Sequence, residues 1–178
     1  GEVMGVIGSN GSGKTSLLKI LGGVLKPDRG PIKIDHHVCP LLEVGTGFEQ
    51  ELSGTDNIFL NGAVLGIKKK DLKARYNDIV EFAELESFID SPLKHYSTGM
   101  RMRLGFAIAI HGNPEILLVD EVLAVGDASF QKKAINKMSS VSKDYGRTVI
   151  FVSHNMESIK KLCTKVIILN QGKVIDYG

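Results

Sequence analysis

Gly8-Ser9-Asn10-Gly11-Ser12-Gly13-Lys14-Thr15 is the stretch that decides the fold of this 178-residue chain. It matches the phosphate-binding pattern G-x-x-x-x-G-K-[ST], here called the P-loop, and it lies between an apolar β-branched run and an amphipathic helix opening near Ser16. Glycines let the backbone curl so that its N–H groups converge on a phosphate, and the helix N-terminus adds a positive dipole end. Lys14 supplies a charge for the β- and γ-phosphates, and the Thr15 hydroxyl suits Mg²⁺. The P-loop and Ser16 therefore predict a nucleoside triphosphate site.

Composition narrows the class of protein further. A hydrophobic content of 43% supports one globular domain, and a net charge of +2 gives no basic footprint for nucleic acid. The one basic run, Lys68-Lys69-Lys70, fits a solvated helix face. No apolar stretch approaches the ~18 residues that a membrane helix needs, so we expect a soluble, cytosolic chain. Cys39 and Cys163 stand alone and predict small apolar core residues rather than a disulfide.

The hydrophobic pattern alternates between strands and helices. It predicts an α/β P-loop core with a mainly parallel sheet, interrupted by a helical insert at about 55–111. The single domain 1–178 would then have its core at about 1–54 and 112–178. Because the chain opens on the P-loop strand rather than on Met, we expect an N-terminally truncated fragment. The predicted strands are 2–7, 31–35, 41–44, 115–119, 147–152 and 165–169, the last leading into a hairpin; the predicted helices are 14–24, from about 55, 70–85, 97–111, 128–144 and 155–162.

An apolar strand that ends in two acids provides the second chemical element. Ile116-Leu117-Leu118-Val119-Asp120 has the Walker B form, and we expect this strand to lie beside the P-loop strand so that Asp120 reaches Mg²⁺. Glu121 follows at once and could hold and polarise a water in line with the γ-phosphate, as a general base.

Two further motifs gain meaning from their place in the chain. Ser97-Thr98-Gly99 begins a helix and alone would be an ordinary N-cap, but its position shortly before the Walker B acids favours an anion site. His154 follows a strand and would lie at the carboxyl edge of the sheet, where ligands bind in open α/β folds. There it could hydrogen-bond a γ-phosphate oxygen or the attacking water.

This order of motifs resembles the nucleotide-binding domain of the ABC ATPases over essentially the whole chain. The resemblance implies that the chain binds ATP and Mg²⁺ and hydrolyses ATP to drive transport. It implies a head-to-tail dimer in which Ser97 and Gly99 contact the γ-phosphate held by the P-loop of a second copy. Asp127 would be the acid at that dimer seam.

Three stretches resemble one group within the family, the exporters of O-antigen, capsule and teichoic-acid polysaccharides. They imply an ATPase subunit that powers export of a lipid-linked polysaccharide through a separate membrane permease, which the segment at about 43–60 would contact. The chain would then lie at the cytoplasmic face of the inner or plasma membrane and touch it only through the permease, with no nucleic acid partner. The stretches are Tyr96-Ser97-Thr98-Gly99-Met100, called the signature segment below, Asp120 to Lys133, and Leu41 to Ile58.

The sequence departs from the family pattern in two places. Glu43 stands where most members have a Gln that links Mg²⁺ to the transporter, and Gln50 lies too far along to replace it. The residue that stacks on adenine would lie upstream of Gly1.

Alternatives within the family remain. An ABC transporter ATPase for a different cargo fits the same motifs. A soluble ABC ATPase of the DNA repair or chromosome type needs long coiled coils or a basic face, which this sequence lacks. A non-hydrolysing regulatory subunit is disfavoured because the P-loop, both acids and His154 are all present.

Overall fold

The computed structural model describes residues 1–41, 47–112, 114–120 and 127–178. These residues divide into two compact units. The first consists of residues 1–41, 114–120 and 132–178, and the second consists of residues 47–112 and 127–131. The predicted boundaries of the core and the helical insert stay predictions.

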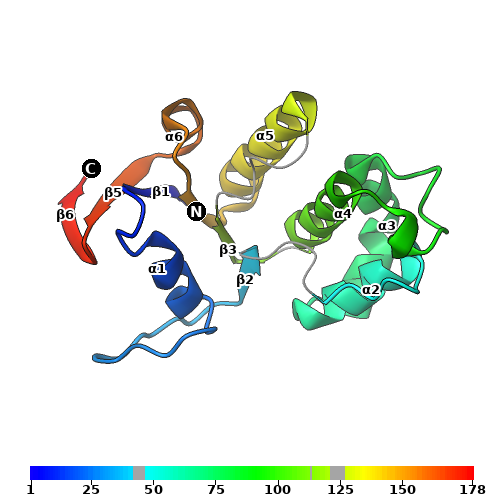
Figure 1. The fold of residues 1–178 in the computed structure, drawn as a ribbon, viewed down its shortest axis with the longest axis horizontal. Coiled ribbons are helices and arrows are strands. Elements are labelled where there is room, and N and C mark those ends of the chain that lie inside the picture. Colours follow the sequence, from blue (N-terminus) through cyan, green and yellow to red (C-terminus); the bar gives the residue numbers. More distant parts are fainter. Residues whose placement is uncertain (42–46, 113, 121–126) are drawn as a thin grey trace. The chain divides into compact units, whose positions relative to one another are not determined.

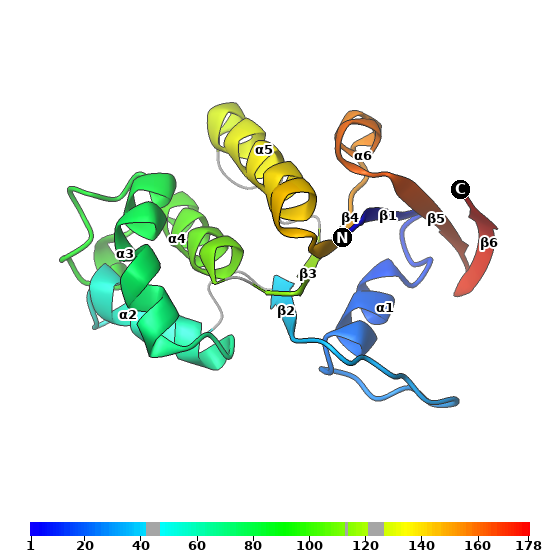
Figure 2. The ribbon, with the colours of Figure 1, turned by 180° about the vertical axis from the view of Figure 1, so that it is seen from behind.

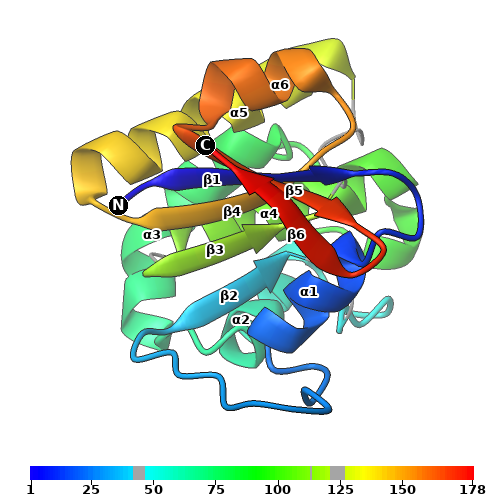
Figure 3. The same ribbon diagram turned by 90° about the vertical axis from the view of Figure 1, so that its left-hand side faces the viewer.

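The first unit is built on a six-stranded sheet with the strand order β2-β3-β4-β1-β5-β6 (Figure 3). Neighbouring strands are parallel except for β5 and β6, which form an antiparallel hairpin. The α/β class and the mainly parallel sheet are therefore confirmed. The strands are β1 (Val3–Gly8), β2 (Val38–Leu41), β3 (Ile116–Val119), β4 (Thr148–Val152), β5 (Lys165–Asn170) and β6 (Lys173–Tyr177).

Helices cover both faces of this sheet, as the continuous apolar strands require. Helix α1 (Lys14–Leu21) lies on one face, and α5 (Ala128–Tyr145) and α6 (Met156–Leu162) lie on the other (Figures 1 and 2). The core under α1 joins the helix to four strands, because Leu18 packs with Val6, Leu118, Val152 and Leu169. On the opposite face, a Cβ at Gly5 would lie 3.0 Å from Cys163 Sγ and 3.2 Å from Ile159 of α6.

The Walker B strand does not lie beside the P-loop strand, so that expectation was wrong. Strand β4 pairs with β1 on one side and with β3 on the other. The apolar pattern identifies all three as buried strands, but a local pattern carries no information about which buried strands are neighbours.

Three other element predictions needed correction. Residues 31–35 form no strand, and Ile32 and Ile34 are exposed; no described strand pairs with them. The strand predicted at 41–44 begins earlier, as β2, and its residues 42–44 lie outside the described residues. Helix α1 ends at Leu21 rather than at residue 24, because a turn begins at Gly22 and Gly23.

The second unit is helical. It contains α2 (Gly54–Val64), α3 (Lys69–Ala83), the short 3-10 helix η1 (Leu93–His95), α4 (Thr98–His111) and the first turn of α5. Residues 104–111 of α4 are all buried, so this helix forms the centre of the unit. Rings from three helices close its core: Phe82 of α3 packs against Phe106 and His111 of α4 and against Phe130 of α5.

The surface of the second unit follows the sequence pattern as well. Lys68-Lys69-Lys70 is exposed at the start of α3, as predicted for a solvated face. Among the helices of the described residues, none is long and apolar enough to cross a membrane.

Candidate active site

The P-loop leads from β1 into α1 with an open helix N-terminus. Gly13 precedes α1 with φ 103°, a left-handed conformation that favours glycine, and no side chain caps the helix. The first N–H groups of a helix have no partner within the helix. Backbone donors and the positive end of the helix dipole are therefore presented at one point, which is the physical requirement for binding phosphate.

Lys14 lies against the loop that it follows. Its side chain is only 7% exposed, and Nζ donates to the backbone oxygens of Gly8 at 2.8 Å and Ser9 at 2.9 Å. These two bonds close the P-loop into a ring around the ammonium group. The charge is thereby fixed at the loop that we expect to hold phosphates.

A polar cavity of about 320 Å³ lies at the P-loop. It is formed entirely within the first unit and brings together the P-loop, the end of β3 and the segment after β4. His154 is thus placed beside the P-loop, where the sequence predicted it. The cavity is lined by Asn10, Gly11, Gly13, Lys14, Thr15, Ser16, Asp120 and His154.

Two oxygen groups meet at the edge of this cavity, although β4 lies between β1, which leads into the P-loop, and β3, which precedes Asp120. Thr15 Oγ1 donates to Asp120 Oδ2 at 3.2 Å. A hydroxyl and a carboxylate side by side fit Mg²⁺, which takes one or two protein oxygens and completes its shell with phosphates and water. Among the described residues no cluster of three or more His, Cys, Asp or Glu side chains could hold a metal alone. Glu121, the predicted base, lies outside the described residues.

The signature segment belongs to the second unit, where hydrogen bonds of Ser97 and Tyr96 fix its position. Ser97 caps α4, because its Oγ accepts from the Met100 N–H at 3.2 Å. Tyr96 is buried, and its hydroxyl donates to the Phe88 carbonyl at 2.7 Å. Burial, with smaller effects of Asp90 and Tyr76, raises the pKa of Tyr96 to about 12, so the hydroxyl keeps the proton that it donates. Tyr96, which the sequence marked only as part of a resemblance to polysaccharide exporters, therefore also has a structural role as a buried hydrogen-bond donor.

Asp127 has a structural task that sequence reasoning missed. Its Oδ1 accepts from the Phe130 N–H at 2.8 Å at the start of α5. An acid just before a helix is a recognisable N-cap signal, and the pattern was present. Asp127 is also exposed, so its predicted place at a dimer seam stays a prediction.

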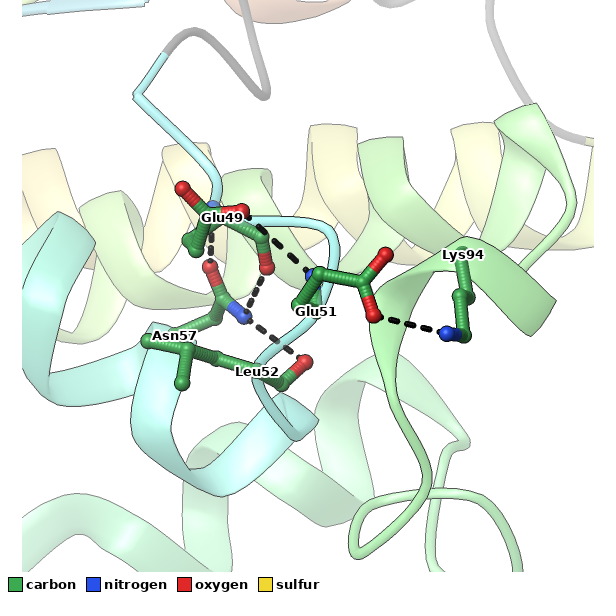
Figure 4. A network of polar contacts seen from close by, with 5 residues as sticks. All are labelled: Glu49, Glu51, Leu52, Asn57 and Lys94. Atoms are coloured by element: carbon green, nitrogen blue, oxygen red, sulfur yellow. Dashed lines mark hydrogen bonds and ion pairs between the residues drawn. The ribbon is translucent and has the colours of Figure 1, made fainter.

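The segment before α2 is fastened to the segment before the signature (Figure 4). Asn57 is fully buried; its Oδ1 accepts from the Glu49 N–H at 2.8 Å, and its Nδ2 donates to the carbonyls of Glu49, Leu52 and Ser53. Lys94 of η1 pairs with Glu51 at 2.6 Å. Sequence reasoning placed Asn57 only at a helix start, since nothing local shows that an amide will be buried.

Neither residue considered for the missing glutamine role is among the described residues that line the cavity. Gln50 lies in the fastened segment of the second unit, where its backbone oxygen accepts from the Lys94 N–H at 2.9 Å. Glu43 lies outside the described residues.

Comparison with known proteins agrees with this geometry. The profile of the family described as "ABC transporter" matches residues 1–124. The chain is 43% identical over its whole length to the "O-antigen export system ATP-binding protein RfbB" of Klebsiella pneumoniae and covers 72% of it. It is 42% identical over its whole length to the "Teichoic acids export ATP-binding protein TagH" of Bacillus anthracis and covers 32% of that longer protein.

Solved structures show the same fold. With the "Dimeric structure of a post-hydrolysis state of the ATP-binding cassette MJ0796 bound to ADP and Pi" the TM-score is 0.84 at 22% identity, over 99% of this chain and 84% of the other. The chain therefore belongs to the ABC transporter family, and its fold is that of an ATP-binding cassette.

Proposed function

We propose that this chain binds ATP with Mg²⁺ and hydrolyses it to power export of a lipid-linked polysaccharide, of the O-antigen, capsule or teichoic acid type, through a separate membrane permease. The observation that carries the proposal is the cavity where Lys14, Thr15, Asp120 and His154 meet around an open helix N-terminus. The names of the two relatives support the class of cargo.

Each group at the cavity has a task that its chemistry allows. The P-loop N–H groups and Lys14 hold the β- and γ-phosphates and offset their charge. Thr15 and Asp120 would hold Mg²⁺, which when bound would offset the negative charge of the phosphates. Glu121 takes a proton from the attacking water as general base, and His154 orients that water or a γ-phosphate oxygen.

The site is completed by a second copy of the chain in a head-to-tail dimer. Ser97 and Gly99 of one copy contact the γ-phosphate held by the other, and Asp127 lies at the seam. The open N-terminus of α4 supports this role, because Ser97 satisfies one backbone donor and leaves others for an anion.

The permease contacts the segment at about 43–60, and the chain is peripheral at the cytoplasmic face of the membrane. Support comes from the described part of that segment, where Leu52 and Leu60 are exposed apolar side chains.

The Lys14→Ala variant tests the nucleotide site. Hydrogen bonds to a charged group contribute about 1.5–3 kcal/mol, so ATP affinity should fall by roughly 10- to 150-fold, with ATPase activity lost. Binding of a fluorescent ATP analogue and phosphate release measure the two effects. Lys33→Ala is the matched control, because the Lys33 side chain is 85% exposed and outside the cavity. Near-parental affinity of Lys14→Ala would sink the P-loop assignment.

Cargo needs a separate test in cells. Deleting the gene should leave surface polysaccharide depleted and lipid-linked polysaccharide accumulated inside the cell, and the parental gene but not Lys14→Ala should restore export. An unchanged cell surface, with active ATPase in vitro, would point to an ABC transporter with a different cargo.

A further inference from the structure

The hairpin turn between β5 and β6 lies directly behind the P-loop. The Gly172 N–H in this turn donates to the Ser12 carbonyl at 2.9 Å. A Cβ at Gly13 would lie 3.6 Å from the Gly172 Cα, so the two backbones are in near contact. Neither Gln171 nor Gly172 lines the cavity, and the proposed chemistry does not use them.

The bond from Gly172 fixes a peptide plane that matters for phosphate binding. In a trans peptide the C=O of Ser12 and the N–H of Gly13 point in opposite directions. Because the Ser12 carbonyl is held toward the turn, the Gly13 N–H points away from it, and Gly13 lines the cavity. Gly13 has φ 103°, and a glycine with this freedom could otherwise rotate its peptide plane.

We propose that the β5–β6 turn positions the P-loop, with the Gly172 N–H holding the Ser12–Gly13 peptide in its phosphate-binding orientation. The inference rests on the proposed nucleotide binding. Gly172 is a positioning residue, since it acts through the P-loop and touches no substrate.

The packing around Ser12 supports this role. Ser12 is 2% exposed, and its Oγ has no hydrogen-bond partner within the described part of the chain. The Ser12 side chain therefore does not hold the Ser12–Gly13 peptide, whereas the Ser12 carbonyl accepts the hydrogen bond from Gly172. Behind the start of the loop the fit is close as well, because a Cβ at Gly8 would overlap the Leu169 carbonyl oxygen of β5.

The turn adopts the conformation that this bond requires. Gln171 has φ 46° and Gly172 has φ 75°, both left-handed, as in the two-residue turns whose twist matches a hairpin. A glutamine in this conformation is strained, and it persists because the paired strands on both sides hold it. A Cβ at Gly172 would meet nothing within 4 Å, so a side chain that tolerates positive φ fits there.

Two variants of Gly172 test the turn: one keeps the N–H donor and the left-handed backbone, and the other removes both. Gly172→Asn keeps the N–H and tolerates left-handed φ, so its ATP dissociation constant should stay within about twofold of the parent. Gly172→Pro has no N–H and fixes φ near −65°, so its ATP affinity should fall about tenfold. Titration of full-length chains with a fluorescent ATP analogue and Mg²⁺ measures both, with circular dichroism to check folding. A folded Gly172→Pro variant with parental affinity overturns the inference.

A measurement on the parent protein covers the case in which Gly172→Pro does not fold. If the turn bond favours nucleotide binding, nucleotide must strengthen that bond by the same coupling free energy. The Gly172 amide should therefore exchange its hydrogen several-fold more slowly with ATP and Mg²⁺ than without them, as followed by NMR. A merely structural bond would show the same exchange rate in both states, and that result overturns the inference.

The outcomes also separate this inference from the proposed function. A parent chain with no ATP affinity overturns both. If the parent binds ATP but the exchange rate of the Gly172 amide is the same with and without nucleotide, only the positioning role is overturned.

Discussion

At the scale of single residues, the metal-binding assignment depends on the charge of Asp120 beside the Thr15 hydroxyl. Asp120→Asn keeps the size of the side chain and removes the charge. We expect it to lower ATP affinity in the presence of Mg²⁺ by roughly tenfold and to leave affinity in EDTA unchanged. Isothermal titration in the two buffers measures the difference. Equal losses in both buffers would show that Asp120 acts on the nucleotide or on folding rather than on Mg²⁺.

The two cysteines allow a test of burial at the same scale. Burial raises the pKa of Cys39 to about 12 and that of Cys163 to about 11, from an ordinary value of 9.0. A raised folded pKa means that the thiols favour the folded state below pH 9 and lose this contribution as pH rises further. Native protein should therefore react slowly with Ellman's reagent at pH 8, and guanidinium should release two fast-reacting thiols. Cys39 is buried and Cys163 is half-buried, so rapid labelling of both thiols in the native chain would contradict the burial of Cys39 on β2.

At the scale of elements, Asn57 joins α2 to the segment before it. Its side chain is fully buried and makes hydrogen bonds to the backbone of that segment. Asn57→Ala removes the hydrogen bonds that the fully buried Asn57 amide makes to the Glu49 N–H and carbonyl, which should cost about 1–3 kcal/mol of unfolding free energy. Urea denaturation measures this loss. The control is Lys94→Ala, which breaks only the exposed ion pair with Glu51 and should cost about 0–1 kcal/mol. Equal costs for the two variants would contradict a structural role of the buried Asn57 amide.

Elements were predictable from sequence where one local signal sufficed. The apolar runs predicted β3 and β4, and Ser97 as N-cap predicted the start of α4. The predictions that were wrong concern strand pairing, which depends on residues distant in sequence. The place of β4 between β1 and β3 and the exposure of residues 31–35 follow from tertiary pairing, which no window of the sequence contains.

The residues in and around the candidate site also fall into two groups, those that the sequence could predict and those that it could not. The P-loop, Asp120 and His154 were predictable because a motif and a strand end determine where each side chain lies. Asn57 and the contact of Gly172 with Ser12 were not, since a buried amide and a backbone contact leave no residue-type signature.

At the scale of the whole molecule, the two sets of residues proposed to bind nucleotide fall in different units of the chain. Lys14 belongs to the first unit, and Ser97 and Gly99 belong to the second. In a head-to-tail dimer each site takes the P-loop from one copy and the signature segment from the other. Disabling Lys14 in one copy and Gly99 in its partner therefore leaves one of the two sites with both parts intact.

Mixing two inactive variants tests this arrangement. Lys14→Ala removes the P-loop charge, and Gly99→Asp places a carboxylate where the γ-phosphate should approach, with space for the new side chain because a Cβ there meets only Ser97 Oγ at 3.8 Å. Each variant alone should lack ATPase activity. An equimolar mixture should recover roughly a quarter of parental activity, because about half of randomly formed dimers are mixed and each carries one intact site. A mixture as inactive as its components would show that each chain uses its own signature segment or none.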